Sequence, residues 1–375
     1  ELDDLERQLV RPPPPQYARS HWLLRRGIGV TSLVAWISLA AQEGSLFGPG
    51  GVFPMDERAA RVVELSSTGG ALVVAPSLFY FVGGGPSGLG VVTLLGILAS
   101  LALALGVWAG PAALFSYVAY LSFVSLGAPF FPLQWDTLLL ESLVLCAALS
   151  PWRRFDSIAD AAEPPPLARW AAWLLPARLF FASGLVKLLG GDETWRDGSA
   201  MAFHYWTQPL PSPIAPFAHA MPAWFHAIET AATLVLEIGL PLLVFFGRRA
   251  RAVLAGGIAF LMALIALTGS YGFFNLLTVV LAIALVDDGS LARLAPARLA
   301  PRLRALPPPR TLGARTARAV TAACGVLFVL GTLELVTSIG FAPLVPDFVL
   351  AATDTLGPWR VTSSYGLFAN MTTTR

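Results

Sequence analysis

The stretch "IETAATLVLEIGLPLLVFFGRRA", residues 228–250, decides the class of fold. It is almost wholly apolar and long enough to cross the hydrocarbon core of a bilayer, for which a helix needs about 20 residues. It ends in Arg248 and Arg249, and arginines beside an apolar span indicate its cytoplasmic end. The stretch therefore predicts a transmembrane helix over residues 223–246.

The composition of the whole chain supports this interpretation. Of its 375 residues, 55% are hydrophobic and 13% are charged, whereas a soluble domain carries about 25% charged residues. We expect an all-α fold, a polytopic transmembrane helical bundle of about eight or nine spans. No basic stripe interleaved with aromatic residues is present, which excludes nucleic acid as a partner. The other apolar segments lie at 24–41, 69–83, 88–109, 112–127, 134–150, 167–189, 250–268, 272–287 and 318–339.

Four groups of arginines predict the sidedness of the bundle. The positive-inside rule places all four in the cytoplasm, which sends the loops 42–67 and 190–222 to the opposite side as a polar cap. This sidedness fails if every apolar segment between 69 and 150 crosses fully, so we expect 69–83 or 134–150 to be re-entrant or broken. The groups are Arg11, Arg19, Arg25 and Arg26; Arg153 and Arg154; Arg248, Arg249 and Arg251; and the arginines of 288–318.

Three regions follow from this division. Residues 1–20 contain "RPPPPQYARS", which predicts an extended or disordered N-terminal arm. Residues 21–340 are the transmembrane helical domain, with a cytoplasmic basic loop at 288–318. Residues 341–375 are a noncytoplasmic tail.

Redox and metal chemistry find little support in the sequence. Cys146 and Cys324 each lie in an apolar stretch without a C-x-x-C pair, so we expect two buried free thiols. His204, His219 and His226 have no recognised ligand spacing, and we expect no metal site.

Ionisable side chains inside the predicted spans each need an explanation, because inserting one at a helix centre costs roughly 2.5–3.5 kcal/mol. They either pair as acid with base across the bundle or line a pocket. Glu229 and Glu237 are eight residues apart and can face one interior sector of a helix. The residues in question are Asp136, Glu141, Arg178, Lys187, Glu229, Glu237 and Glu334.

Lys187 has two interpretations. It lies near a helix end, where a lysine can reach the membrane interface or complement the helix C-terminus. It can instead be a desolvated general base, because it leads directly into the loop that carries Trp195 and His204.

The segment "HYWTQPLPSP", residues 204–213, contains three prolines that exclude a helix interior. We expect a non-helical, rigid cap that presents His204, Tyr205, Thr207 and Gln208. Gln208 or His204 is expected to form a hydrogen bond inward, either to backbone or to a carboxylate such as Glu229. The cap is either a plug that closes the bundle or one wall of a pocket.

Several blocks of this sequence resemble the lipase maturation factor family. They are "FHYWTQPLPSP" (203–213), the 228–250 stretch, "TGSYGFFNLLT" (268–278), "LVDD" (285–288) and the tail "SSYGLFANMTTTR" (363–375). The resemblance adds Tyr271 and Asn275 to the pocket candidates. It departs at Trp206, where the eukaryotic motif has an acidic residue, and at the end of the chain, where the family continues into a soluble, β-rich domain.

This resemblance implies a membrane protein that assists folding and maturation of exported proteins such as lipases, with no turnover of its own. The eukaryotic members are endoplasmic-reticulum membrane proteins. A bacterial member would lie in the inner membrane with a periplasm-facing site, and its partners would be membrane lipid and an exported client.

A more distant resemblance implies chemistry. The segment "FASGLVKLLGGDETWRDGSAM", residues 181–201, is similar to a segment of vitamin K-dependent gamma-carboxylases. That match implies an alternative function as a membrane enzyme, with Lys187 as the base that deprotonates a quinol such as vitamin K hydroquinone and His204 nearby. A third interpretation is a bundle that conducts lipid or solute.

Overall fold

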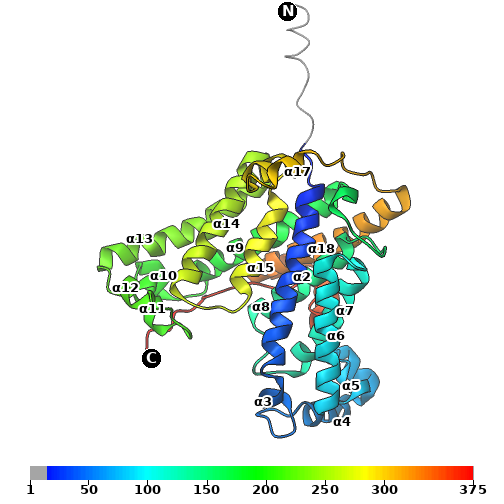
Figure 1. Ribbon diagram of the computed structural model, residues 1–375. Coiled ribbons are helices and arrows are strands. Elements are labelled where there is room, and N and C mark those ends of the chain that lie inside the picture. The colour runs from blue at the N-terminus through cyan, green and yellow to red at the C-terminus, as the bar shows by residue number, and fades with distance from the viewer. Residues whose placement is uncertain (1–14, 375) are drawn as a thin grey trace, which may run out of the picture.

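The computed structural model describes residues 15–374, and no β-sheet is present in that range (Figure 1). Seven of its helices are long and apolar enough to cross a membrane. The chain is therefore a polytopic helical membrane protein, as the sequence predicts. The seven are α2 (Ala18–Ala40), α6 (Pro86–Leu105), α7 (Ala109–Leu126), α9 (Pro166–Leu189), the continuous α13–η2–η3 helix (Ala223–Phe245), α14 (Arg248–Thr268) and the helix from α18 to η6 (Ala314–Leu344).

Two shorter apolar helices complete the bundle. They are α8 (Gln134–Leu149), which packs against α2, α7 and α18, and α15 with η4 (Phe274–Leu285), which packs against α2, α9 and α14. Among the described residues, seven helices are thus long and apolar enough to span a membrane, against the eight or nine spans predicted from the sequence. The remaining elements are α3 (Glu43–Phe47), α4 (Met55–Val74), α5 (Phe79–Val82), η1 (Ile158–Asp160), α10 (Glu193–Asp197), α11 (Ala200–Thr207), α12 (Ala215–His219), α16 (Asp288–Leu294), α17 (Ala300–Arg304), α19 (Asp347–Leu356) and η7 (Gly357–Trp359).

One group of helices consists of α2, α6, α7 and α8. At its centre the hydroxyls of Ser32, Ser100 and Ser116 lie 2.8–3.0 Å from one another. The indole of Trp36 donates to Ser116 Oγ at 3.1 Å. Small polar residues allow membrane helices to approach closely and satisfy each other's hydroxyls, and that is how these helices are joined.

The second group forms around α9. This helix packs against α18 and α8, and also against η2 and η3. Helices α14 and α15 complete the group, and α15 and η4 join it to α2 (Figure 1). Because α9 touches both groups, its side chains decide how they fit together.

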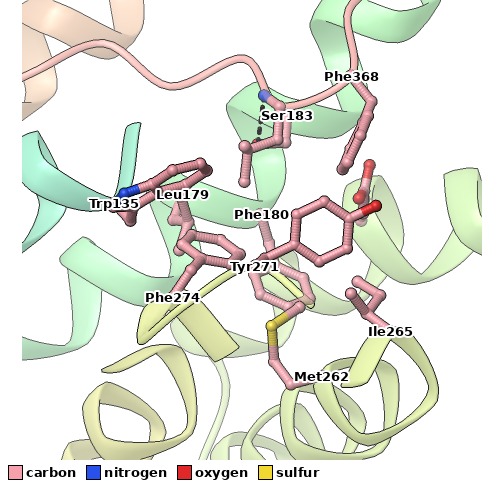
Figure 2. Close-up of a pocket in the computed structure, with 11 residues that line it drawn as sticks. Trp135, Leu179, Phe180, Ser183, Met262, Ile265, Tyr271, Phe274 and Phe368 are labelled. Carbon is pink, nitrogen blue, oxygen red and sulfur yellow. Dashed lines mark hydrogen bonds between the residues drawn. The ribbon is translucent and has the colours of Figure 1, made fainter. Parts of the chain in front are cut away.

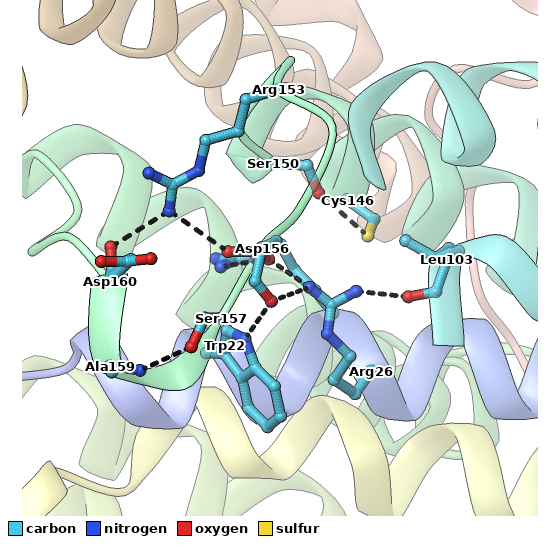
Figure 3. Close-up of polar contacts among 11 residues, drawn as sticks. Trp22, Arg26, Leu103, Cys146, Ser150, Arg153, Asp156, Ser157, Ala159 and Asp160 are labelled. Carbon is cyan, nitrogen blue, oxygen red and sulfur yellow. Dashed lines mark hydrogen bonds and ion pairs between the residues drawn. The ribbon is translucent and has the colours of Figure 1, made fainter. Parts of the chain in front are cut away.

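The described members of the four arginine groups meet at one end of the bundle, called here the arginine-rich end. Asp156, in the loop between α8 and α9, binds both Arg25 and Arg26 of α2 (Figure 3). Arg251 donates to the Tyr17 hydroxyl at 3.1 Å, and Arg310 pairs with Asp160 at 2.5 Å. The assignment of this end to the cytoplasm remains a prediction.

The same end also caps α2. Asp288 accepts hydrogen bonds from the amides of Arg19 at 3.1 Å and Ser20 at 3.0 Å. A carboxylate at a helix N-terminus satisfies free N–H groups and complements the helix dipole. Burial raises the pKa of Asp288, while these amide hydrogen bonds oppose the shift. The "LVDD" block therefore supports the start of α2.

The apolar segment 69–83 is the one that is broken. Helix α4 has a kink at Ser67, where φ is 61°, and ends at Val74. Pro76 disfavours a helical conformation in the preceding residue, and Ala75 lies outside the helical region at φ −150°. Helix α8, in contrast, is continuous from Gln134 to Leu149. The expected interruption thus falls before Gly83.

Two local predictions were wrong. The expected arm extends to residue 20, but α2 begins at Ala18; residues 1–14 lie outside the described range. The expected non-helical segment includes 204–207, which form the last turn of α11. Proline restricts itself and the residue before it, so Pro209 ends the helix at Gln208, whose ψ is 147°, and leaves the preceding turn unaffected.

The contact between α2 and α6 supports a prediction. A Cβ at Gly29 would lie 2.5 Å from the backbone nitrogen of Ala104, and backbone cannot move aside as a side chain can. Gly29→Ala should therefore lower stability by about 1–3 kcal/mol, measured as thermal unfolding in detergent. Gly90→Ala in α6, where a Cβ meets nothing within 4 Å, is the control. Equal stability of both variants would contradict this packing.

Candidate functional site

Lys187 forms a buried ion pair. Its ammonium lies 2.6 Å from Glu237 Oε2 and 3.2 Å from the carbonyl oxygen of Ser183, and the residue is 1% exposed. Glu237 lies on the π-helical turn η2 (Val235–Gly239). A Cβ at Gly184 would lie 2.9 Å from Glu237 Cβ, so the glycine allows α9 and η2 to approach this closely. The lysine side chain is therefore enclosed by protein and does not extend to the surface.

A second buried pair lies elsewhere on α9. The Arg178 guanidinium contacts the Glu141 carboxylate of α8 and donates to the carbonyl oxygen of Gly331, on α18, at 2.9 Å. Arg178 is 2% exposed and Glu141 is 6% exposed. A Cβ at Gly331 would lie 2.8 Å from the guanidinium, so this position too admits only a glycine without rearrangement.

The two pairs fasten opposite sides of α9. Arg178 and Lys187 are nine residues apart, which places them about half a turn apart around a helix of 3.6 residues per turn. Arg178 is bound to α8 and α18, whereas Lys187 is bound to η2. The helix is therefore held by charge on both sides.

The C-terminal tail, residues 363–371, connects the two pairs. At one end Tyr365 Oη donates to Glu141 Oε2 at 2.7 Å, and the amide of Ser363 donates to the same oxygen at 3.2 Å. Further along, the amide of Leu367 donates to Ser183 Oγ at 3.4 Å (Figure 2). The carbonyl oxygen of Phe368 accepts the indole N–H of Trp195 at 3.0 Å.

Phe368 is the centre of an aromatic cluster. Its ring lies edge-on to those of His204, with centroids 5.2 Å apart, and Tyr271, with centroids 5.4 Å apart. Its φ of 55° is unusual for a bulky residue. Trp195 adds a ring 5.2 Å from the Lys187 ammonium. The tail thus closes the space next to the Lys187–Glu237 pair.

His204 is buried within this cluster. Burial lowers its pKa to about 4, and the positive charge of Lys187 acts in the same direction. The imidazole is therefore neutral near pH 7.

Gln208 connects the cap to the loop before α15. Its Nε2 donates to the carbonyl oxygen of Thr268 at 2.9 Å, and its Oε1 accepts from Tyr271 Oη at 3.0 Å. A Cβ at Gly269 would lie 1.9 Å from Gln208 Oε1. The expected inward hydrogen bond to backbone is present, and it joins the "HYWTQPLP" and "TGSYG" blocks.

Glu229 binds Tyr205 and not Gln208. Tyr205 Oη donates to Glu229 Oε1 at 2.7 Å, and His226 Nδ1 lies 3.2 Å from Glu229 Oε2. This network joins α11 to the start of α13.

Three further candidates lie apart from the Lys187 pair. Asp136 accepts from Tyr120 Oη at 2.8 Å and from the amide of Leu133 at 2.8 Å, so it caps its own helix. Thr207 donates to the carbonyl oxygen of Phe203 at 2.9 Å. Asn275 Oδ1 is buried without a hydrogen-bond partner in the structure. Among the described residues, no group of three or more His, Cys, Asp or Glu side chains could hold a metal ion.

The space beside the ion pair is a small cavity of about 30 Å³ (Figure 2). Ligand pockets for small molecules measure about 300–1,000 Å³, so this cavity holds water at most. A quinol would require Phe368 to move away. Its lining residues are Trp135, Leu179, Phe180, Ser183, Glu237, Met262, Ile265, Tyr271, Phe274, Leu367 and Phe368.

Comparison with known proteins identifies the family. The model of the lipase maturation factor transmembrane domain matches residues 19–293. Lipase maturation factor 2 of Gallus gallus is 37% identical over 293 residues, which are 75% of this chain and 40% of that protein. The chain belongs to the lipase maturation factor family. The family's lipase maturation factor 1 of Mus musculus is 28% identical over 394 residues, which are 98% of this chain and 67% of that protein.

The matched part runs from α2 to the last turn of α16. This chain spans about 40% of the length of the lipase maturation factor 2 relatives, and no solved structure matches it. Trp206 packs against the His219 ring with centroids 6.2 Å apart. The similarity to carboxylases remains a prediction.

Three residues of this site are not among the candidates predicted from the sequence. They are Gln134, Tyr365 and Phe368. Gln134 Oε1 accepts from the amide of Gly366 at 3.2 Å. The sequence of the tail resembles the family, but nothing in that sequence indicates that the tail passes across α8 and α9. Tyr365 and Phe368 could have been noticed as large aromatic residues in a polar segment.

The pKa of His204 leads to a pH prediction. The folded-state value of about 4 lies below the ordinary 6.5, so the unfolded chain binds a proton more tightly. Stability should fall as pH drops below 6.5, by about 2 kcal/mol near pH 5. His204→Phe keeps an aromatic ring in the cluster but cannot bind a proton. This variant should therefore lack the loss of stability that protonation of His204 causes, measured as unfolding temperature against pH.

His219→Gln is the matched control, because His219 is exposed on α12. It should keep the acid sensitivity of the parent protein. If the His204→Phe variant loses stability between pH 7 and 5 as steeply as the parent, burial of a neutral His204 is wrong.

Proposed function

We propose that this protein assists the folding or maturation of an exported protein of the lipase class, without a reaction of its own. The proposal rests on membership of the lipase maturation factor family and on one structural observation, an exposed apolar surface on the cap. The lipase maturation factor 2 relatives are longer than this chain, so the client class is part of the proposal.

The apolar surface consists of five large side chains around α12, which lies away from α17 and the arginine-rich end (Figure 1). They recur every three or four residues, through the loop after α11, through α12 and into α13. A folding client exposes apolar segments, and contiguous apolar surface is what binds them. The five are Leu210 (63% exposed), Ile214 (48%), Phe217 (71%), Met221 (45%) and Trp224 (64%).

The interior of the bundle supports binding at the surface and not at an inner pocket. The Lys187 nitrogen donates to Glu237 Oε2 and to the carbonyl oxygen of Ser183, so it is engaged by protein groups and does not face a substrate. The cavity beside it holds about 30 Å³. The carboxylase-like alternative would need both Glu237 and Phe368 to move.

We place the apolar surface in the periplasm of a bacterial cell, or in the endoplasmic-reticulum lumen of a eukaryotic one. This follows from putting the arginine-rich end in the cytoplasm. Exported lipases fold on that side of the membrane. The surface is then on the same side as its client.

The experiment co-expresses the protein with a secreted lipase of its host and measures active lipase. Phe217→Ser together with Trp224→Ser removes two aromatic anchors and should lower active lipase about tenfold, since such anchors carry most of the binding energy in an interface. The membrane protein itself should keep its expression level and unfolding temperature, because both side chains are exposed.

The matched control is Leu65→Ser on α4, which is 70% exposed and lies away from α12 (Figure 1). It should leave lipase maturation unchanged. Normal lipase yield with the double variant would reject the proposed surface. An equal loss of lipase yield with Leu65→Ser would also reject it, because any exposed serine substitution would then lower the yield.

A further inference from the structure

A groove of about 600 Å³ lies between α14, α15 and α16, close to the arginine-rich end. Helices α14 and α15 run next to one another in Figure 1. This groove is separate from the Lys187 site, because none of its lining residues lines the small cavity there.

Small side chains on α14 create the groove. Ala252, Gly256 and Ala259 recur at intervals of four and three residues and therefore lie along one face of the helix. A Cβ at Gly256 would meet nothing within 4 Å, so this position faces open space. Val279 of α15 and Ile283 of η4 form the opposite wall.

The shape and chemistry of the groove fit a hydrocarbon chain. From Ala252 to Ala259 it extends about 10 Å along α14, at a rise of 1.5 Å per residue. Its lining is apolar apart from Ser290 and Arg293 of α16. A volume of this size falls in the range of ligand-binding pockets.

The mouth of the groove is positively charged. Arg293 lines it, and Arg248 and Arg249 lie one helical turn before Ala252 and Val253 of the lining, on the same face of α14. All three arginines are exposed, and none forms an ion pair among the described residues.

The nearest acids do not cancel this charge. Asp287 and Asp288 are 2% and 5% exposed. The carboxylate of Asp287 accepts from the amides of Gly289 and Ser290, both at 3.1 Å, and that of Asp288 caps α2. An apolar groove with a basic mouth at a membrane surface is complementary to a lipid with an anionic head group.

We propose that this groove binds one acyl chain of an anionic phospholipid, with the phosphate at Arg293, Arg248 and Arg249. The chain fills the space over Gly256 and packs between α14 and α15. Bound lipid thereby stabilises the corner where α15 passes into α16, the corner that also caps α2. This proposal does not depend on the function proposed for the cap.

The test uses the purified protein in nanodiscs of phosphatidylcholine with phosphatidylglycerol added. Native mass spectrometry counts retained lipid, and thermal unfolding reports its effect. We expect one phosphatidylglycerol retained in preference to phosphatidylcholine. Arg293→Gln should reduce that preference about fivefold, the effect of one arginine near an anionic surface.

Gly256→Leu fills the groove and should abolish the retained lipid without lowering stability in phosphatidylcholine, because its side chain enters open space. Gly90→Leu on α6, equally unobstructed, is the control and should keep the lipid. Equal retention of both lipids by the parent protein, or unchanged retention by the Gly256→Leu variant, would overturn the proposal.

Discussion

A positive charge inside a membrane bundle has to be neutralised where it lies, and α9 carries two of them. Arg178 finds Glu141 on one side of the helix and Lys187 finds Glu237 on the other. Removing one member of such a pair leaves an uncompensated buried charge, which costs about 3–5 kcal/mol. The positions of α8, α18 and η2 around α9 therefore depend on these two contacts, and the tail is laid across both.

The sequence alone predicts the class of fold well, because the length of an apolar segment is set by the thickness of the bilayer. It also indicates that acids and bases in the spans either pair or line a pocket, since leaving them alone is costly. It could not predict which partner each takes. Lys187 lies 50 residues from Glu237 along the chain, and only the packing of α9 against η2 brings them together. The contacts of tail residues such as Phe368 could not be predicted for the same reason, because they too depend on how distant segments pack.

The errors at the cap have a local cause. Proline restricts itself and the residue before it, but not the turn further upstream. The aromatic residues of "HYWT" therefore remain in α11, while the prolines form the loop that Gln208 fixes to Thr268. With its interior filled in this way, we propose that the bundle interacts through its surfaces, namely the apolar surface of the cap and the apolar groove with its basic mouth.

The most direct test of this account is a double-mutant cycle on Lys187 and Glu237, in which each residue is replaced by Met singly and together. Each single variant should lose about 3–5 kcal/mol of stability, whereas the double variant should recover most of it and still support lipase maturation. A double variant that folds as stably as the parent protein but has lost all function would contradict the account, because it would show that the chemistry of the lysine is required.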